Sequence, residues 1–132
     1  MFRISTLLAA ITLFTASPAA ALRVVGEIRD ADTGKLIPAR IYIQDAAGKW
    51  LFPDSNSNKG TAVRYEKQNR KNPKSVEMHT TLSAHPFSIE LEPGNYTVTV
   101  ERGKEYLATE SQIKVTAGMK RLKLILKRWI NM

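Results

Sequence analysis

The sequence predicts an all-β protein, a sandwich of about seven antiparallel strands, and two observations carry this prediction. Apolar and polar residues alternate with a period of two in five segments, which are 22–29, 40–44, 87–91, 96–101 and 121–127. Such alternation puts the apolar side chains on one face of a strand. After residue 21 we find no convincing helical period. Two sheets packed face to face are the simplest way to bury single apolar faces.

Each element follows from this alternation and from the turns between the segments. The inward faces should bury ten residues: Val24, Ile28, Ile41, Ile43, Ile89, Leu91, Val98, Val100, Leu122 and Leu124. Turns are expected at 30–34 after the first strand and at 45–48, where Gly48 is free to take a positive φ. Pro93-Gly94 is typical of a type II turn.

One segment breaks the pattern. Residues 53–74 hold few apolar side chains, and six Lys and Arg against two acidic residues. Such a composition buries little apolar surface to offset the entropy of ordering. We expect one long basic loop, either functional or the most mobile part of the chain.

The first 21 residues predict a secretory signal peptide. A basic start at 1–3 precedes an apolar run of 11 residues at 4–14, and small residues at 19–21 form an A-x-A cleavage site. The alternative, a membrane anchor, would need a run of about 20 residues. Cleavage would leave a domain at 22–128 and a tail at 129–132. The absence of cysteine suits an exported bacterial protein, periplasmic or extracellular, held together by its core alone.

The charge balance is basic. The chain has 20 Lys and Arg against 12 Asp and Glu, a net charge of +8, and +7 once Arg3 is removed with the leader. Basic surfaces attract nucleic acid, anionic lipid or acidic polysaccharide, and export argues against nucleic acid. Solubility alone is the other explanation.

Two motifs together resemble a known family. The first is Gly26-Glu27-Ile28-Arg29-Asp30 followed by Asp32-Thr33-Gly34-Lys35-Leu36-Ile37-Pro38-Ala39-Arg40, and the second is Leu91-Glu92-Pro93-Gly94-Asn95-Tyr96-Thr97-Val98-Thr99-Val100. This layout is similar to carboxypeptidase regulatory-like domains. The resemblance implies a seven-stranded transthyretin-like (prealbumin-like) sandwich over about 22–127, and it says little about function.

Further segments resemble the N-terminal accessory domain of exported CehA/McbA-type metallohydrolases. They include Trp50-Leu51-Phe52-Pro53, Ala84-His85-Pro86-Phe87 and Leu126-Lys127-Arg128-Trp129-Ile130. In that family a similar sandwich precedes a PHP-type catalytic domain that opens with His-x-His. This sequence has no His-x-His and two histidines in all. The resemblance therefore implies the accessory part without its catalytic domain, and no metal ligand is carried over.

Catalytic and metal-binding patterns are weak in the residues themselves. His79 and His85 are six positions apart, which suits neither helical nor strand spacing for two ligands of one metal. Ser75, Ser83 and Ser88 have histidines nearby in sequence but lack the order of a catalytic triad. We therefore predict a non-catalytic protein with no cofactor and no metal, while a stand-alone hydrolase remains as an alternative.

Four apolar side chains are the candidate interaction residues. Trp50 and Phe52 should share one face of a strand, where aromatic rings can stack on sugars or meet a partner. Trp129 and Ile130 follow the last strand, where they would meet a next domain or fold back onto the sandwich. The first hypothesis is an exported accessory module of a metallohydrolase that is missing or encoded separately. The alternative is a module that binds carbohydrate or the cell surface through the basic loop and the two aromatics.

Overall fold

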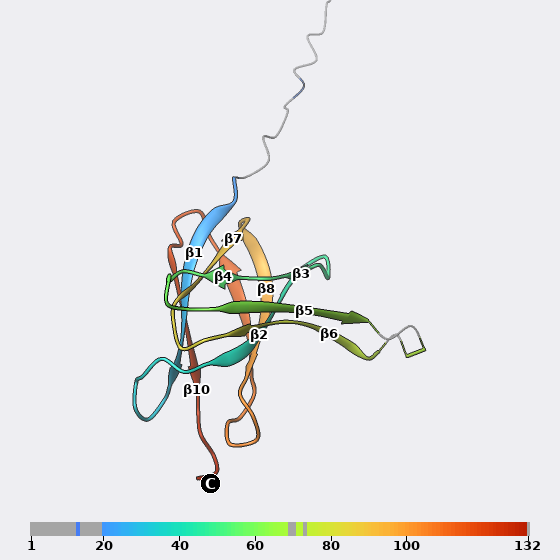
Figure 1. Cartoon of the computed structure of the whole chain (residues 1–132). Coiled ribbons are helices and arrows are strands. Elements are labelled where there is room, and N and C mark those ends of the chain that lie inside the picture. The colour runs from blue at the N-terminus through green and yellow to red at the C-terminus, as the bar shows by residue number, and fades with distance from the viewer. Residues whose placement is uncertain (1–12, 14–19, 69–70, 73, 132) are drawn as a thin grey trace, which may run out of the picture.

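The computed structural model describes residues 13, 20–68, 71–72 and 74–131, and within them it is all-β with no helix (Figure 1). The ten strands are β1 (Leu22–Asp30), β2 (Ala39–Asp45), β3 (Trp50–Leu51), β4 (Asp54–Ser55), β5 (Ala62–Gln68), β6 (Val76–Leu82), β7 (Phe87–Leu91), β8 (Gly94–Glu101), β9 (Thr109–Val115) and β10 (Arg121–Leu126). The predicted all-β class is confirmed, with ten strands in place of about seven. Most of the predicted signal peptide lies outside the described residues.

The strands form two sheets. One has the order β10-β1-β7-β4, and the other has the order β5-β6-β2-β8-β9 with β3 beside β2. Most neighbours are antiparallel, as expected, but β1 and β10 run parallel, with Gly26 opposite Leu122. Local alternation cannot predict this pairing, because the two strands come from opposite ends of the domain.

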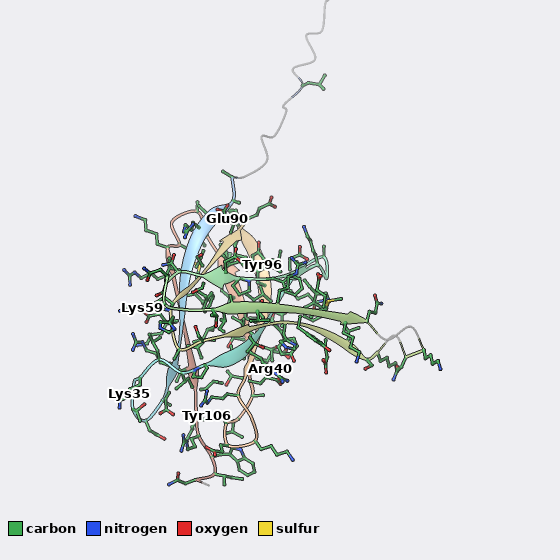
Figure 2. The ribbon with its side chains drawn as sticks, viewed as in Figure 1. Lys35, Arg40, Lys59, Glu90, Tyr96 and Tyr106 are labelled. Atoms are coloured by element: carbon green, nitrogen blue, oxygen red, sulfur yellow. The ribbon has the colours of Figure 1, made fainter. Side chains whose placement is uncertain are left out.

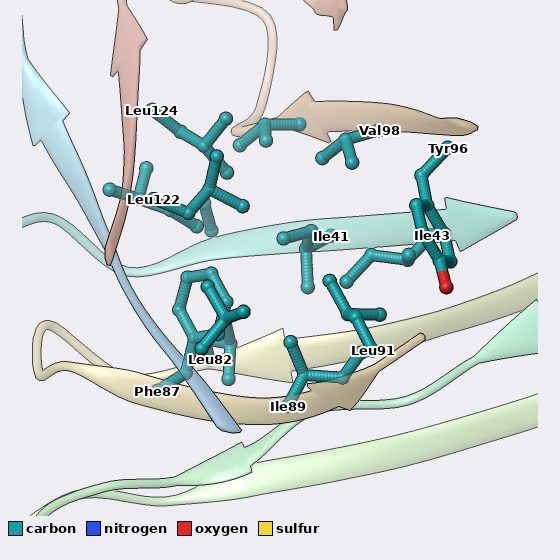
Figure 3. Packing of buried hydrophobic residues seen from close by; sticks show 14 of the residues in the cluster. Ile41, Ile43, Leu82, Phe87, Ile89, Leu91, Tyr96, Val98, Leu122 and Leu124 are labelled. Atoms are coloured by element: carbon teal, nitrogen blue, oxygen red, sulfur yellow. The ribbon is translucent and has the colours of Figure 1, made fainter. Parts of the chain in front are cut away.

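The core lies between the two sheets. All ten residues predicted to be buried are at most 8% exposed. Figure 3 shows Phe87, Ile89 and Leu122 of the first sheet meeting Ile41 and Ile43 of the second. Because each strand contributes alternate side chains, the core follows directly from the period-two pattern.

The prediction of one long loop at 53–74 is wrong. This segment contains β4, and it contains β5, which pairs with β6 along the whole of Ala62–Gln68. Residues 63–68 are exposed on both faces of β5, so the sequence has no apolar alternation there from which a strand could be predicted. Backbone hydrogen bonds to β6 order this polar segment in place of apolar burial.

The pair formed by β5 and β6 projects from the body of the sandwich (Figure 1). β6 pairs with β2 only over residues 80–82, and β3 lies on the same edge of β2 further along. The remainder of β6 therefore has β5 as its described neighbour. The C-terminal tail leaves the sandwich in a different direction from this projection (Figure 1).

The turns occur where they were expected, with one difference in type. Gly34 and Gly48 have φ of 69° and 86°, left-handed values that favour glycine. Gly94 has φ of 155°, far from the roughly 80° of a type II turn. The turn between β7 and β8 is therefore not of type II, and Gly94 is already the first residue of β8.

Candidate functional site

The segment that follows β10 runs beside residues 105–107. Tyr106 and Arg128 form an antiparallel bridge. On either side of it, the Leu107 N–H donates to the Lys127 carbonyl at 3.0 Å and the Trp129 N–H donates to the Glu105 carbonyl at 2.9 Å. The tail is thus held by backbone hydrogen bonds along a short two-stranded ladder.

Trp129 is hydrogen-bonded and nevertheless exposed. Its indole Nε1–H donates to the Lys104 carbonyl at 2.8 Å, yet the residue is 58% exposed. Leu107 and Ile130 nearby are 48% and 37% exposed. Since residues 105, 107, 127 and 129 alternate with the bridged pair, Leu107 and Trp129 lie on the same face of the ladder. We call Leu107, Trp129 and Ile130 the C-terminal surface.

A buried polar cluster anchors this surface. The Tyr106 hydroxyl donates to Asp30 Oδ2 at 2.7 Å, and Arg128 Nη2 donates to the Tyr106 oxygen at 3.0 Å. The other Asp30 oxygen, Oδ1, accepts from the backbone N–H groups of Asp32 and Thr33. Tyr106 and Asp30 are both nearly fully buried, and Figure 2 shows Tyr106 at the end of the sandwich from which the tail leaves.

The electrostatics of the cluster favour an ionised Asp30. The hydrogen bond from Tyr106, with those from the turn amides, lowers the pKa of Asp30 to about 2. The one signal in the sequence for this cluster is a carboxylate, Asp30, at the inward position that follows Val24, Gly26 and Ile28.

Trp50 lies on the outer face of the larger sheet. It is half-buried, and it lines a hollow of about 250 Å³ with six neighbours: Tyr42, Gln44, Thr97, Thr99, Glu101 and Glu110. These are hydroxyl, amide and carboxylate groups, and no cation is among them. The Tyr42 hydroxyl donates to Glu101 Oε1 at 3.0 Å, and burial together with Glu101 raises the pKa of Tyr42 to about 12.

Phe52 does not join Trp50 at this hollow. β3 ends at Leu51, so Phe52 lies beyond the strand and is not among the lining residues. Its ring is covered by the Arg64 guanidinium, 3.9 Å from the ring centroid. The structure therefore separates the two aromatics that the strand pattern placed on one face.

The two histidines have different surroundings. His79 is 5% exposed and lies between Tyr42 and Tyr65, with both ring centroids at 5.2 Å. Burial lowers its pKa, and Arg40 lowers it further. Its Nδ1 is buried without a hydrogen-bond partner. His85 instead has its Nδ1 3.0 Å from the Ser83 hydroxyl oxygen.

Ser83 and His85 form the one serine–histidine contact among the predicted candidates. The same Ser83 hydroxyl accepts from the Thr61 N–H at 2.8 Å and contacts the Thr61 carbonyl at 3.2 Å. It therefore ties the start of β5 to the end of β6. This is a structural use of the hydroxyl, because it joins two backbone segments.

No protein-family model, curated protein or solved structure matches this chain. Among the described residues, no three His, Asp or Glu side chains are grouped as metal ligands. Within the same part of the chain, no helix has the length and apolar character to cross a membrane.

Proposed function

We propose that this protein is an exported, non-catalytic accessory module that binds a partner protein through the C-terminal surface. The observation that carries the proposal is the state of Trp129, which is more than half exposed although its backbone and indole N–H groups are both hydrogen-bonded. An exposed Trp that is already held in place loses little conformational freedom on binding. Tryptophan is also among the residues that contribute most to protein interfaces.

The setting of Trp129 supports an interface more than a random exposed side chain. Single exposed apolar residues are common on protein surfaces, but here three lie within one short ladder and the tail after it. Beneath them, the hydrogen bonds of Asp30, Tyr106 and Arg128 fix the ladder to the end of β1. Trp129 and the segment that carries it are thus held by hydrogen bonds before any partner binds.

The class of partner follows from the resemblance in the sequence. Segments such as Trp50–Leu51 and 126–130 are similar to the accessory domain of CehA/McbA-type metallohydrolases, where the equivalent tail leads to the catalytic domain. We propose a metallohydrolase domain that is encoded separately from this chain as the partner. The use of Ser83 in tying loops together is consistent with a module that has no chemistry of its own.

Site-specific photo-crosslinking in the producing cell tests this proposal. A benzoyl-phenylalanine is placed at Ile130, and in a matched variant at Ile125, which is similarly exposed at 43% but lies on β10. We expect one discrete adduct from position 130 and none from 125. An adduct with a metallohydrolase supports the full proposal, while an adduct with another single protein supports an interaction module with a different partner. Equal or absent crosslinking at both positions would contradict it.

Carbohydrate binding is the second candidate, and the Trp50 hollow favours it. An aromatic ring beside hydroxyl and amide groups suits a sugar, which offers an apolar face and many hydroxyls. Since Glu101 and Glu110 line the hollow and no Lys or Arg does, a neutral polysaccharide fits better than an acidic one. Affinity electrophoresis should show retardation in a neutral glycan that Trp50→Ala abolishes and Trp129→Ala preserves. Equal retardation of both variants would count against this site.

A further inference from the structure

β5 is an edge strand with an accessible backbone. Among the described strands it has one neighbour, β6, and it ends the order of the larger sheet. Residues 63–68 are exposed, and they include two large apolar side chains, Val63 at 60% and Tyr65 at 41%. An edge of this kind offers unpaired N–H and C=O groups to another strand.

The sequence of β5 is complementary to itself when read in the opposite direction. In an antiparallel pair of two copies centred on Tyr65, Arg64 faces Glu66 of the second copy, and Glu66 faces Arg64 of the second copy. Val63 then faces Lys67, and Ala62 faces Gln68, so the whole strand finds a partner. Opposite charges directly across an antiparallel pair stabilise it, and like charges destabilise it.

Neighbouring registers lack this complementarity. A two-fold axis keeps the same face of both copies on one side of the sheet, so one strand can slide along the other only by two residues at a time. Each such step moves the centre of the pair by one residue. Centring the pair on Arg64 would bring two guanidinium groups together, and centring it on Glu66 would bring two carboxylates together. The register centred on Tyr65 is the one of these three that opposes no like charges.

The side chains are already arranged for this pairing. Arg64 and Glu66 form an ion pair within the chain, so both project from the same face of β5. On the other face Tyr65 stacks on His79, with an interplanar angle of 24°, and His79 contacts Tyr42. A second copy would place its own Tyr65 beside the first and extend this aromatic row across the joined sheet.

We propose that β5 is a self-association edge, through which two copies of this chain pair antiparallel in the register centred on Tyr65. The larger sheet of one copy and the larger sheet of the other then form one continuous sheet across the two molecules. Seven residues from each copy bury well under about 1,200 Å² in total, the size class of weak and transient complexes. The dimer is therefore reversible and appears as protein concentration rises. This edge is separate from the C-terminal surface, so each proposal stands without the other.

Analytical ultracentrifugation of the purified protein over a concentration series tests the edge. The wild type should shift from monomer to dimer, and Trp129→Ala should behave identically. Arg64→Glu and Glu66→Arg alone each place like charges at both central contacts. Each should weaken self-association by at least about tenfold. Far-UV circular dichroism checks that both variants keep their strands.

An equimolar mixture of the two charge variants is the decisive measurement. In a mixed pair the carboxylate introduced by Arg64→Glu faces the guanidinium introduced by Glu66→Arg, and the native Arg64 and Glu66 face each other across the second contact. We expect the mixture to dimerise about as well as the wild type while each variant alone stays monomeric. A wild type that remains monomeric up to about millimolar concentration would overturn the proposal. Variants that dimerise unchanged, or a mixture that stays monomeric, would overturn it equally.

Discussion

Replacing Gly26 with alanine should be the most damaging single methyl addition in the core. Gly26 lies opposite Phe87 across the antiparallel pair of β1 and β7, and the Phe87 ring lies over it. A Cβ at position 26 would stand 2.1 Å from Phe87 Cζ and 2.4 Å from Cε2. Contacts below 3.0 Å essentially never occur for a real Cβ, so the ring would have to move by about 1 Å or more.

Phe87 has nowhere to move, because it is fully buried among the residues of both sheets (Figure 3). Forcing an extra methyl into a filled core costs about 1–3 kcal/mol, occasionally more. We expect Gly26→Ala to lie at the upper end, about 3 kcal/mol. That is a large part of the roughly 5–15 kcal/mol that holds a small domain folded.

Urea unfolding followed by circular dichroism measures the effect, and Gly118→Ala is the matched control. A Cβ at Gly118 meets nothing within 4 Å, and Gly118 does not have a positive φ. The free energy of unfolding of the Gly118→Ala protein should therefore differ from that of the wild type by about 0.5 kcal/mol or less. Phe87→Leu should restore part of the stability lost in Gly26→Ala although it destabilises the wild type, because the two side chains compete for one space. A Gly26→Ala protein with the wild-type urea midpoint would refute the reasoning.

Three further outcomes are expected. The lowered pKa of Asp30 contributes stability that is complete above pH 3.8, its usual pKa, and is lost as the pH falls towards about 2. Tyr106→Phe removes the main cause of the shift, so the free energy of unfolding of this variant should depend less on pH between these two values. The same pH dependence in the variant and the wild type would contradict this. The pKa of His79 is lowered by burial, so its charging opposes folding as the pH falls below 6.5. In urea unfolding at a series of pH values, His79→Gln should therefore lose less stability below 6.5 than the wild type, and an equal loss would contradict this. Trypsin should cut first after Lys71, outside the strands, and not within β5; early cleavage inside β5 would show that its pairing with β6 is weak.

The core and the site differed in how far the sequence could predict them. Burial of residues such as Val24 and Ile41 was readable because alternation is local and each strand faces the core on one side. Asp30 stands at an inward position of the same alternation, and its partner Tyr106 is 76 positions away. Which hydroxyl would satisfy a buried carboxylate is a non-local matter, so the cluster under the C-terminal surface was missed.

β5 was missed for a different physical reason. A strand exposed on both faces has no apolar period, and Ala62–Gln68 is stabilised mainly by hydrogen bonds to β6. The separation of Trp50 from Phe52 also depends on where β3 ends. If β3 extended by one residue to include Phe52, both aromatic side chains would lie on the same face of the strand. Polar edges and two-residue strands carry too little side-chain pattern to be recognised one by one.

The amino-acid sequence by itself determined the all-β class and the inward face of each main strand, because period-two alternation is a property of neighbouring residues. The tertiary structure alone decided which strands are neighbours, including the parallel pairing of β1 with β10 and the placing of β5 at an edge. It also decided that the Trp129 side chain is hydrogen-bonded to the Lys104 carbonyl and at the same time exposed to solvent. Alternation specifies which face of a strand is buried, while its partners depend on contacts between residues far apart in the chain, and those contacts form only when both sheets close on a common core.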